Sequence, residues 1–195
     1  MRLFSYIFGV LLIIPLFGTT VENSSINCIK SDKDIFAIYK LDNKTMAIGG
    51  DFTKVNLKKR SKIALIEPNS CKLLDKFSNF KIENKSNPSN SFIRAIERYK
   101  DYLIIGGVFS SIDDGDGIQK CDGLAIIDLK SQKLFWCYEG IDIKDAHGVF
   151  SLSVDRKNKI LYVGGDFREP KRALLAFDIS SLDKDESNIV YLDAP

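Results

Sequence analysis

The sequence predicts an all-β protein, an array of about three units that each contain four short antiparallel strands. The first observation is that Gly-Gly-x-Phe occurs three times, and the second is that each copy follows a short apolar run. The third is the spacing, because the copies begin 57 and 58 residues apart (49 to 106 and 106 to 164). A fixed period of this length indicates a repeat architecture. The repeated residues are Gly49, Gly50 and Phe52, then Gly106, Gly107 and Phe109, then Gly164, Gly165 and Phe167.

The first two strands of each unit flank a polar turn. First strands rich in Ile, Phe and Val are expected at 36–39, 92–96 and 149–154. Polar turns follow at 42–44, 99–101 and 156–158. The second strands are the apolar runs at 46–48, 103–105 and 161–163. Because these runs do not alternate with polar residues, they suit strands covered on both faces, although a buried helix segment would also fit such short runs.

The glycine pair and two further strands complete each unit. Glycine ends the apolar run where the backbone must pass close to a neighbour or take a positive φ, and the phenylalanine that follows can pack into the seam between units. Third strands that end in an acidic residue are expected at 64–67, 125–128 and 175–178. Weaker fourth strands follow at 71–74, 133–137 and 189–192.

Four-stranded antiparallel units repeated around an axis are the blades of a β-propeller. The sequence therefore divides into an N-terminal segment, 21–34, and a repeat region, 35–195, with blades at about 35–80, 92–139 and 149–195. Closed propellers have about 4 to 8 blades, so three blades predict a partial ring. Three explanations stay open: a fragment of a longer propeller, a chain that self-associates through its open blade edges, and an open array.

The repeat region resembles the delta-60 repeat β-propellers. Repeats of that family run Leu/Ile-x-Val/Ile-Gly-Gly-x-Phe, then a variable loop, then a strand of the Leu-Ala-x-Phe-Asp type. The third unit matches this pattern best, at 160–167 and 174–178. Kelch propellers are the rival, but their repeats place a Tyr and a Trp at set positions, and this sequence has one tryptophan, Trp136. The resemblance implies a propeller scaffold, and it implies a binding module only by analogy.

The first 20 residues have the layout of a secretory signal peptide. A positive start at 1–2 is followed by an apolar run at 3–17 and by small residues before a polar segment begins. This run is shorter than the ~20 residues that a membrane-spanning helix needs. We therefore expect cleavage after Thr20, no stable membrane span afterwards, and a secreted or cell-surface protein, either periplasmic or extracellular. An uncleaved anchor and a buried N-terminal strand are the alternatives.

The four cysteines are expected to form disulfides if the chain is exported. Cys121 opens the third strand of the second unit and Cys137 closes the fourth, so the turn between these strands would bring them opposite each other. We favour this pair and, by elimination, Cys28 with Cys71. Free buried thiols are the alternative, whereas a cysteine metal site is disfavoured because no Cys-x-x-Cys pair occurs.

The loops that follow the glycine pairs vary most between units, and function is expected where repeats differ. The first and third of these loops are basic, and all three are expected to open on the same face of the propeller. The candidate binding residues on this loop face are Lys58, Lys59, Arg60, Arg168 and Arg172.

The second of these loops is acidic and rich in glycine. Asp113, Asp114 and Asp116 lie close together on a turning backbone, which makes them a candidate calcium site. The spacing lacks the full EF-hand pattern, so a solvated acidic turn is the favoured interpretation. The sequence leads us to expect no metal and no cofactor.

No catalytic set stands out in the sequence. His147 is the single histidine and lies in an expected turn between units, and no Gly-x-Ser-x-Gly motif occurs. A net charge of +2 does not favour nucleic acid as a partner. The sequence thus favours a secreted, non-enzymatic propeller module that binds a protein or glycan through its loops. The alternatives are a structural fragment of a larger surface protein and a carbohydrate-active hydrolase, which would need two carboxylates that converge on a pocket.

Overall fold

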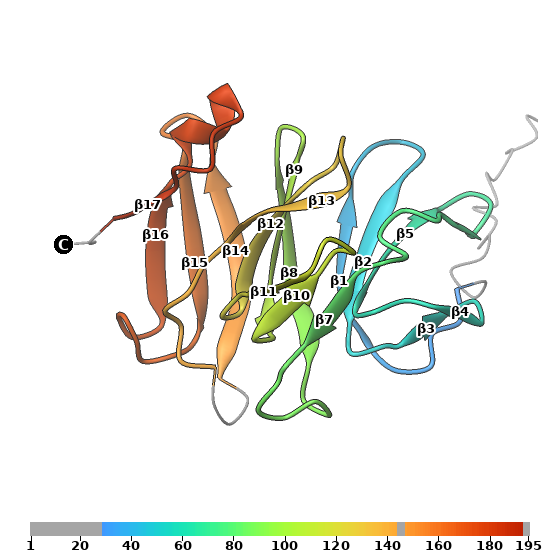
Figure 1. The fold of residues 1–195 in the computed structure, drawn as a ribbon. Coiled ribbons are helices and arrows are strands. Elements are labelled where there is room, and N and C mark those ends of the chain that lie inside the picture. The colour runs from blue at the N-terminus through green and yellow to red at the C-terminus, as the bar shows by residue number, and fades with distance from the viewer. Residues whose placement is uncertain (1–28, 144–146, 193–195) are drawn as a thin grey trace, which may run out of the picture.

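Three four-stranded antiparallel sheets stand side by side in the computed structural model, which describes residues 29–143 and 147–192 (Figure 1). Within each sheet, strands that succeed one another along the chain are neighbours. Each sheet is thus a meander, and the order of strands is the same in all three. The fold is an all-β, propeller-type array that forms a partial ring, as the repeat predicts.

The twelve sheet strands lie at the positions expected from the repeat. Sheet one contains β1 (Ile35–Lys40), β2 (Met46–Gly50), β5 (Ile63–Glu67) and β6 (Lys72–Leu73). Sheet two contains β8 (Phe92–Tyr99), β9 (Tyr102–Val108), β12 (Leu124–Asp128) and β13 (Lys133–Cys137). Sheet three contains β14 (Gly148–Asp155), β15 (Ile160–Asp166), β16 (Leu174–Asp178) and β17 (Val190–Leu192).

The loops after the first two glycine pairs contain short strands that the sequence did not predict. In unit one, β3 (Lys54–Val55) and β4 (Lys58–Lys59) form a hairpin. In unit two, β10 (Ser111–Asp113) pairs with β11 (Ile118–Lys120) on one side and with β7 (Lys81–Glu83) on the other. Strands of two or three residues are too short to show a hydrophobic period. Unit three instead has a 3-10 helix, η3 (Ser180–Lys184), before β17.

The disulfide predicted between Cys121 and Cys137 is present, with the two Cα atoms 4.9 Å apart. It joins the segment before β12 to the end of β13. Cys71 is also disulfide-bonded, but its predicted partner, Cys28, lies outside the described residues. The signal peptide expected at 1–20 lies outside them too. In the part of the chain that is described, no helix is long and apolar enough to cross a membrane.

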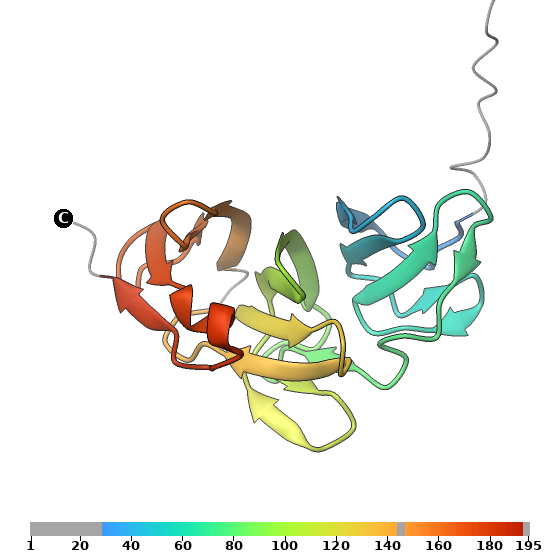
Figure 2. The same ribbon diagram turned by 90° about the horizontal axis from the view of Figure 1, so that it is seen from above.

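Seen from above, the sheets fan out from a shared inner edge (Figure 2). Their first strands, β1, β8 and β14, gather at this edge, and the fourth strands lie farthest from it. Strand β8 contacts β1 and β2 of sheet one, and β14 contacts β8 and β9 of sheet two. Neighbouring sheets therefore pack face to face. We call the surface along β1, β8 and β14 the inner edge.

Most of the hydrophobic core lies in the two seams between neighbouring sheets. Along β12, Leu124 and Ile126 belong to the cluster between sheets two and three, whereas Ala125 and Ile127 belong to the cluster between sheets one and two. All four side chains are completely buried. Full burial of a Leu or Ile side chain stabilises a fold by roughly 1.5–3 kcal/mol. Because sheet two is covered on both faces, its central strands, β9 and β12, are apolar without alternation.

The phenylalanine of each repeat packs toward the sheet that precedes it. Phe109 lies in the seam between sheets one and two, and Phe167 lies in the seam between sheets two and three. Phe52 has no preceding sheet among the described residues and instead clusters with Val55 and Ile48 on the outer face of sheet one. All three phenylalanines are at most 1% exposed. The loop after each glycine pair thus covers the face on which its phenylalanine packs.

The second glycine of each pair lies opposite a bulge in the first strand of its sheet. The pairing skips one residue of that strand, at 36, 94 and 150. A side chain on Gly50 would collide with the Asp34 carbonyl oxygen, and one on Gly107 would collide with the Phe92 carbonyl oxygen. A bulge brings the backbone of one strand unusually close to its partner, so only glycine fits at these positions.

Candidate functional site

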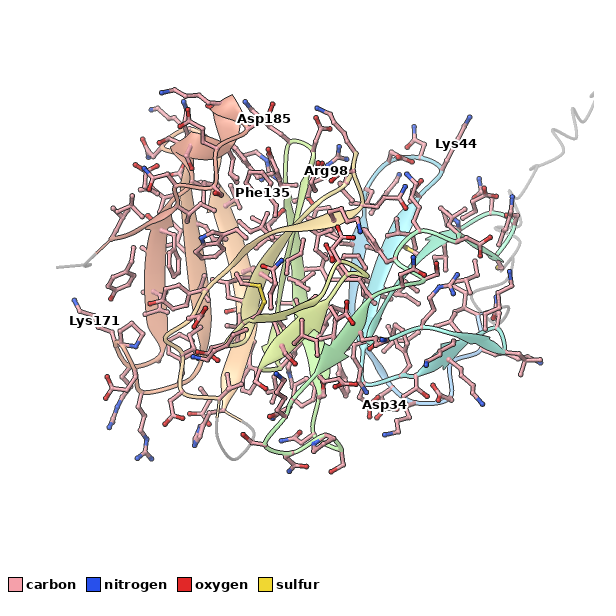
Figure 3. The ribbon with its side chains drawn as sticks, in the orientation of Figure 1. Asp34, Lys44, Arg98, Phe135, Lys171 and Asp185 are labelled. Atoms are coloured by element: carbon pink, nitrogen blue, oxygen red, sulfur yellow. A yellow bond between two sulfur atoms is a disulfide. The ribbon has the colours of Figure 1, made fainter. Side chains whose placement is uncertain are left out.

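The array has two rims, which labelled side chains mark in Figure 3. The turn rim carries the hairpins between the first and second strands, and Lys44, Arg98 and Asp185 lie along it. The loop rim carries the loops after the glycine pairs, and Asp34 and Lys171 lie toward it. The sequence predicts the binding surface on the loop rim.

The basic candidates of the loop rim do not form one site. Lys58 and Lys59 are exposed in β4, whereas Arg168 and Arg172 are exposed in the loop between β15 and β16. These two strand regions lie at opposite ends of the array (Figure 1). The structure therefore places two separate basic patches where the sequence predicts one surface.

Arg60 is a structural residue and does not face a ligand, contrary to expectation. Its side chain is only 4% exposed. Its guanidinium donates hydrogen bonds to the Lys59 carbonyl oxygen at 2.7 Å and to the Leu74 carbonyl oxygen at 2.8 Å. It also lies 3.3 Å from a carboxylate oxygen of Asp75. The charge therefore holds the segment after sheet one against the β3–β4 hairpin.

The carboxylates of the acidic loop, which the sequence offers as a weak calcium candidate, each have a partner within the fold. Asp113 pairs with the Lys81 ammonium at 3.4 Å, and Asp116 pairs with the Lys133 ammonium at 2.8 Å. Asp114 is buried, and its carboxylate accepts a backbone N–H of β13 at 2.8 Å. Among the described residues, no three His, Cys, Asp or Glu side chains are placed to hold a metal ion. The three carboxylates of the loop therefore contact β7 and β13 of the fold.

His147 lies just before β14 and contacts the end of β15. Its Nδ1 atom is 3.1 Å from a carboxylate oxygen of Asp166. Among the contacts of the described residues, no serine or cysteine joins this pair. The contact holds the start of β14 beside the end of β15 at the loop rim.

A charged cluster on the turn rim joins sheet two to η3. Asp183 accepts a hydrogen bond from the Tyr99 hydroxyl at 2.6 Å and forms ion pairs with Lys100 and Lys159, both at 2.7 Å. The ammonium groups of Lys100 and Lys159, together with the Tyr99 hydroxyl, hold the pKa of Asp183 far below its usual range. Burial and the neighbouring carboxylate raise the pKa of Tyr99 to about 12. Because the carboxylate, the hydroxyl and the two ammonium groups are already partners of one another, we assign the cluster a structural role.

Two shallow pockets flank the turn that leads from sheet one to β7. Their volumes are about 280 and 410 Å³, and they share Ser78, Asn79 and Phe80. Charged side chains of the first pocket already have partners, since Asp75 pairs with Arg60 and Lys133 pairs with an acid of the loop. The pockets therefore offer few free charged groups to a ligand.

The inner edge carries a cluster of aromatic side chains around one arginine. Phe36, Arg94 and Phe150 are the bulge residues of β1, β8 and β14, so they occupy one equivalent position in the three units. The Arg94 guanidinium carbon lies 5.7 Å from the centre of the Phe36 ring and 4.9 Å from the centre of the Phe150 ring. Phe92 packs edge to face on Phe36, with ring centres 5.5 Å apart. We call these four residues the Phe–Arg cluster.

The guanidinium of Arg94 is held but not neutralised. Its side chain is exposed, and among the described residues it makes no hydrogen bond and no ion pair. An exposed cation–π contact stabilises by about 0.5–1 kcal/mol, enough to favour the position between the two rings. The planar fork of N–H donors stays available, and this fork matches the two oxygens of a carboxylate. Phe36, which is 41% exposed, adds apolar surface beside it.

The sequence reasoning missed this cluster, although an alignment of the units contains the signal. The segments 35–37, 93–95 and 149–151 read Ile-Phe-Ala, Ile-Arg-Ala and Val-Phe-Ser. The flanking residues keep their character while the middle one changes. That pattern is typical of a position that leaves both packed faces of a sheet.

Comparison with known proteins finds distant structural similarity and no match of sequence. No protein-family model matches the chain, and no curated protein is similar to it. The chain is similar in structure to the β-propeller domain of Cps50 (Swd1) from Myceliophteria thermophila, with 13% sequence identity and a TM-score of 0.44. The similarity covers 77% of this chain and 40% of that chain, so this protein spans well under half of the length of its structural neighbour.

Proposed function

We propose that the protein is a non-enzymatic module that binds a protein segment through the Phe–Arg cluster on its inner edge. The segment carries a carboxylate beside an apolar side chain. One observation carries this proposal: the exposed guanidinium of Arg94 is held between two phenylalanine rings and has no acid of the described chain to neutralise it.

The chemistry of the cluster resembles that of the centres of protein interfaces. Aromatic residues and arginine are enriched there, and they contribute most of the binding energy. A hydrogen bond to a charged group contributes about 1.5–3 kcal/mol, which corresponds to roughly a ten- to hundredfold change in affinity. A neutral glycan would leave the guanidinium without a counter-charge, so an acidic protein segment is the better fit.

The predicted loop face is a secondary contact area in this proposal. Lys58, Lys59, Arg168 and Arg172 are exposed and would speed the encounter with an acidic partner. Because they form two patches at opposite ends of the array, they do not define a single specificity.

Export and repeat type are further parts of the proposal. The disulfide between Cys121 and Cys137 supports export, because disulfides persist in oxidising compartments. The signal-peptide layout of residues 1–20 supports the same conclusion. The spacing of Gly-Gly-x-Phe supports a repeat of the delta-60 type.

The test is a selection of displayed random peptides on the oxidised protein. The wild type should enrich peptides that contain Asp or Glu next to an aromatic or branched apolar residue. Arg94→Gln should bind these peptides about ten- to hundredfold more weakly, because the charged hydrogen bonds are lost. Arg172→Gln is the matched control, since it removes an exposed arginine of the loop rim: its affinity for the peptides should stay close to that of the wild type, and only the association rate should fall. An acid preference that persists in Arg94→Gln would contradict the proposal.

A further inference from the structure

The two seams between sheets are built from the same contact. A Cβ atom added to Gly49 would lie 2.6 Å from Cγ2 of Ile93 and 3.2 Å from Cδ1 of Ile96. A Cβ atom added to Gly106 would collide in the same way with Val149 of sheet three. The first glycine of each pair therefore leaves a socket, and apolar side chains from the first strand of the next sheet fill it.

The third socket is not filled by another sheet of the described chain. The nearest groups to a Cβ atom on Gly164 are the Ser151 side chain of the same sheet and the Ala173 carbonyl oxygen. Leu174 lies directly opposite Gly164 in the register and is 53% exposed, and Tyr162 on the same face is 38% exposed. This face of sheet three is thus an apolar surface around an open socket.

The other end of the array carries apolar side chains of the kind that fill the sockets. Strand β1 pairs with β2 in the register that β8 shows with β9, so Ile35 and Ile38 hold the positions of Ile93 and Ile96. Among the described residues no sheet precedes β1, and Ile38 is 63% exposed. Among the described residues, the first sheet thus leaves Ile38 exposed, with Ile35 partly buried against the Phe52 cluster, and the last sheet leaves the socket at Gly164 without a neighbouring sheet. We call Ile35 and Ile38 the plug.

We propose that copies of this chain associate head to tail, with Ile35 and Ile38 of one copy seated against Gly164 of the next. The contact repeats the seam that already joins the sheets within the chain. Plug and socket lie at opposite ends of the fan (Figure 2), so the interface is heterologous. Two such fans form a closed ring where the rotation permits, and otherwise the copies form an open chain.

The hairpin on the outer face of sheet one leaves room for this contact. Val55 of that hairpin follows Phe52 by three residues, as Ile112 of β10 follows Phe109. Ile112 and Phe109 lie together in the seam between sheets one and two, which pack with β10 in place. The β3–β4 hairpin takes the corresponding place at the head of the array.

Charges at the turn rim also match across the proposed interface. Within the chain, Arg98 of β8 donates a hydrogen bond to the Leu41 carbonyl oxygen of unit one at 2.7 Å. The strand registers place Lys40 at the position of Arg98 and Asp155 at the position that corresponds to Leu41. Head-to-tail packing therefore brings the exposed Lys40 of one copy toward Asp155 of the other, whose carboxylate also accepts hydrogen bonds from Lys157 and Asn158 of its own turn.

This inference does not depend on the Phe–Arg cluster, so it can fail while the proposed binding function holds. The experiment is light scattering behind a sizing column, on the oxidised chain over a wide range of concentrations. The wild type should form dimers or longer species. Ile38→Glu and Leu174→Glu should each weaken the association by about a hundredfold or more, because a charge would be buried in an apolar seam. Leu57→Glu is the control, since Leu57 is 93% exposed at the hairpin tip, and it should assemble like the wild type.

Mixing the two variants tests the direction of the contact. Ile38→Glu keeps an intact socket and Leu174→Glu keeps an intact plug, so a one-to-one mixture should form a dimer that neither extends nor closes. Circular dichroism of each variant establishes that it is folded. The proposal is overturned if the wild type stays monomeric, if Ile38→Glu assembles like the wild type, or if the mixture remains monomeric. Assembly that is lost only in Leu174→Glu would indicate that two sockets face each other, and it would overturn the proposal as well.

Discussion

Replacing Gly106 with alanine should open the seam between sheets two and three, because the socket has no space for a methyl group. The new Cβ atom would lie 3.0 Å from Cβ of Val149 and closer still to its Cγ1 atom. Val149 is completely buried, and its β-branched side chain has few alternative rotamers. Overpacking of a core by one group costs about 1–3 kcal/mol, so we expect a loss of about 2 kcal/mol in the free energy of unfolding.

The assay is urea unfolding of the oxidised protein followed by the fluorescence of Trp136. This tryptophan lies in the same seam, with its ring centre 5.9 Å from that of Phe177, so its emission reports on the packing of sheets two and three. Gly164→Ala is the matched control at a concentration low enough to keep the protein monomeric, since its new Cβ atom then meets only the rotatable Ser151 side chain of its own sheet and a more distant carbonyl oxygen. We expect the control to lose less than about 1 kcal/mol.

A double-mutant cycle identifies the contact that causes the loss. Val149→Ala removes the Cγ1 methyl group, the atom closest to the new Cβ atom, so Gly106→Ala should cost much less in that background. The coupling energy between the two changes should be about 1 kcal/mol or more. Equal stabilities of Gly106→Ala and Gly164→Ala would refute the socket, and so would strict additivity in the cycle.

Three further predictions concern the charged clusters and the disulfide. The pKa of Asp183 is lower in the folded protein than its ordinary value of 3.8, so its stabilisation is present above that pH and is lost as the pH falls below it. Asp183→Asn should therefore lower the melting temperature at neutral pH and flatten its decline in acid, and an unchanged acid profile would contradict this. Arg60→Ala should lose about 2 kcal/mol in urea unfolding, because the partly buried Leu74 carbonyl oxygen loses a charged donor, whereas the exposed Lys59→Ala should change stability by less than about 0.5 kcal/mol. Replacing both Cys121 and Cys137 with serine should lower the free energy of unfolding by about 3 kcal/mol, since the bond spans 16 residues of sequence. A reducing agent should lower the free energy of unfolding of the wild type by at least as much.

The strands of the three sheets were predictable because their cause is local. Each apolar run is a strand buried in a seam, and each glycine pair is a place where backbone or a neighbouring side chain comes too close for a Cβ atom. Gly49 shows the side-chain role in unit one, and Gly107 shows the backbone role in unit two. A repeat multiplies such a local signal, so three copies in register identify what one copy would leave ambiguous.

The charged residues were harder to assign because their partners are distant in the sequence. Arg60 follows two exposed lysines, yet its guanidinium reaches the carbonyl oxygen of Leu74, 14 residues later. Asp114 lies in an acidic loop but is buried against β13. Whether such a side chain turns inward depends on what the fold places above it, and a charge pattern alone carries no such information.

The Phe–Arg cluster is formed by strand pairing, and the register of strand pairing is harder to predict from the sequence than the strands themselves. Phe36, Arg94 and Phe150 meet because the pairing of the first and second strands skips one residue in all three sheets. The skip is a consequence of the second glycine, but the side chain that it directs to the inner edge is unrelated to the glycine motif. The motif therefore reveals the scaffold and leaves its surface chemistry open.

Selection acts differently on the bulge residue and on the residues beside it. In unit two, the residues on either side of it, Ile93 and Ala95, are almost completely buried, so any change there is tested against packing. The bulge residue itself belongs to neither face, and it already varies between phenylalanine and arginine within one chain. Three single substitutions, one in each unit, could therefore replace the whole recognition surface while the seams keep their side chains. A scaffold of this kind can acquire new partners without first losing its fold.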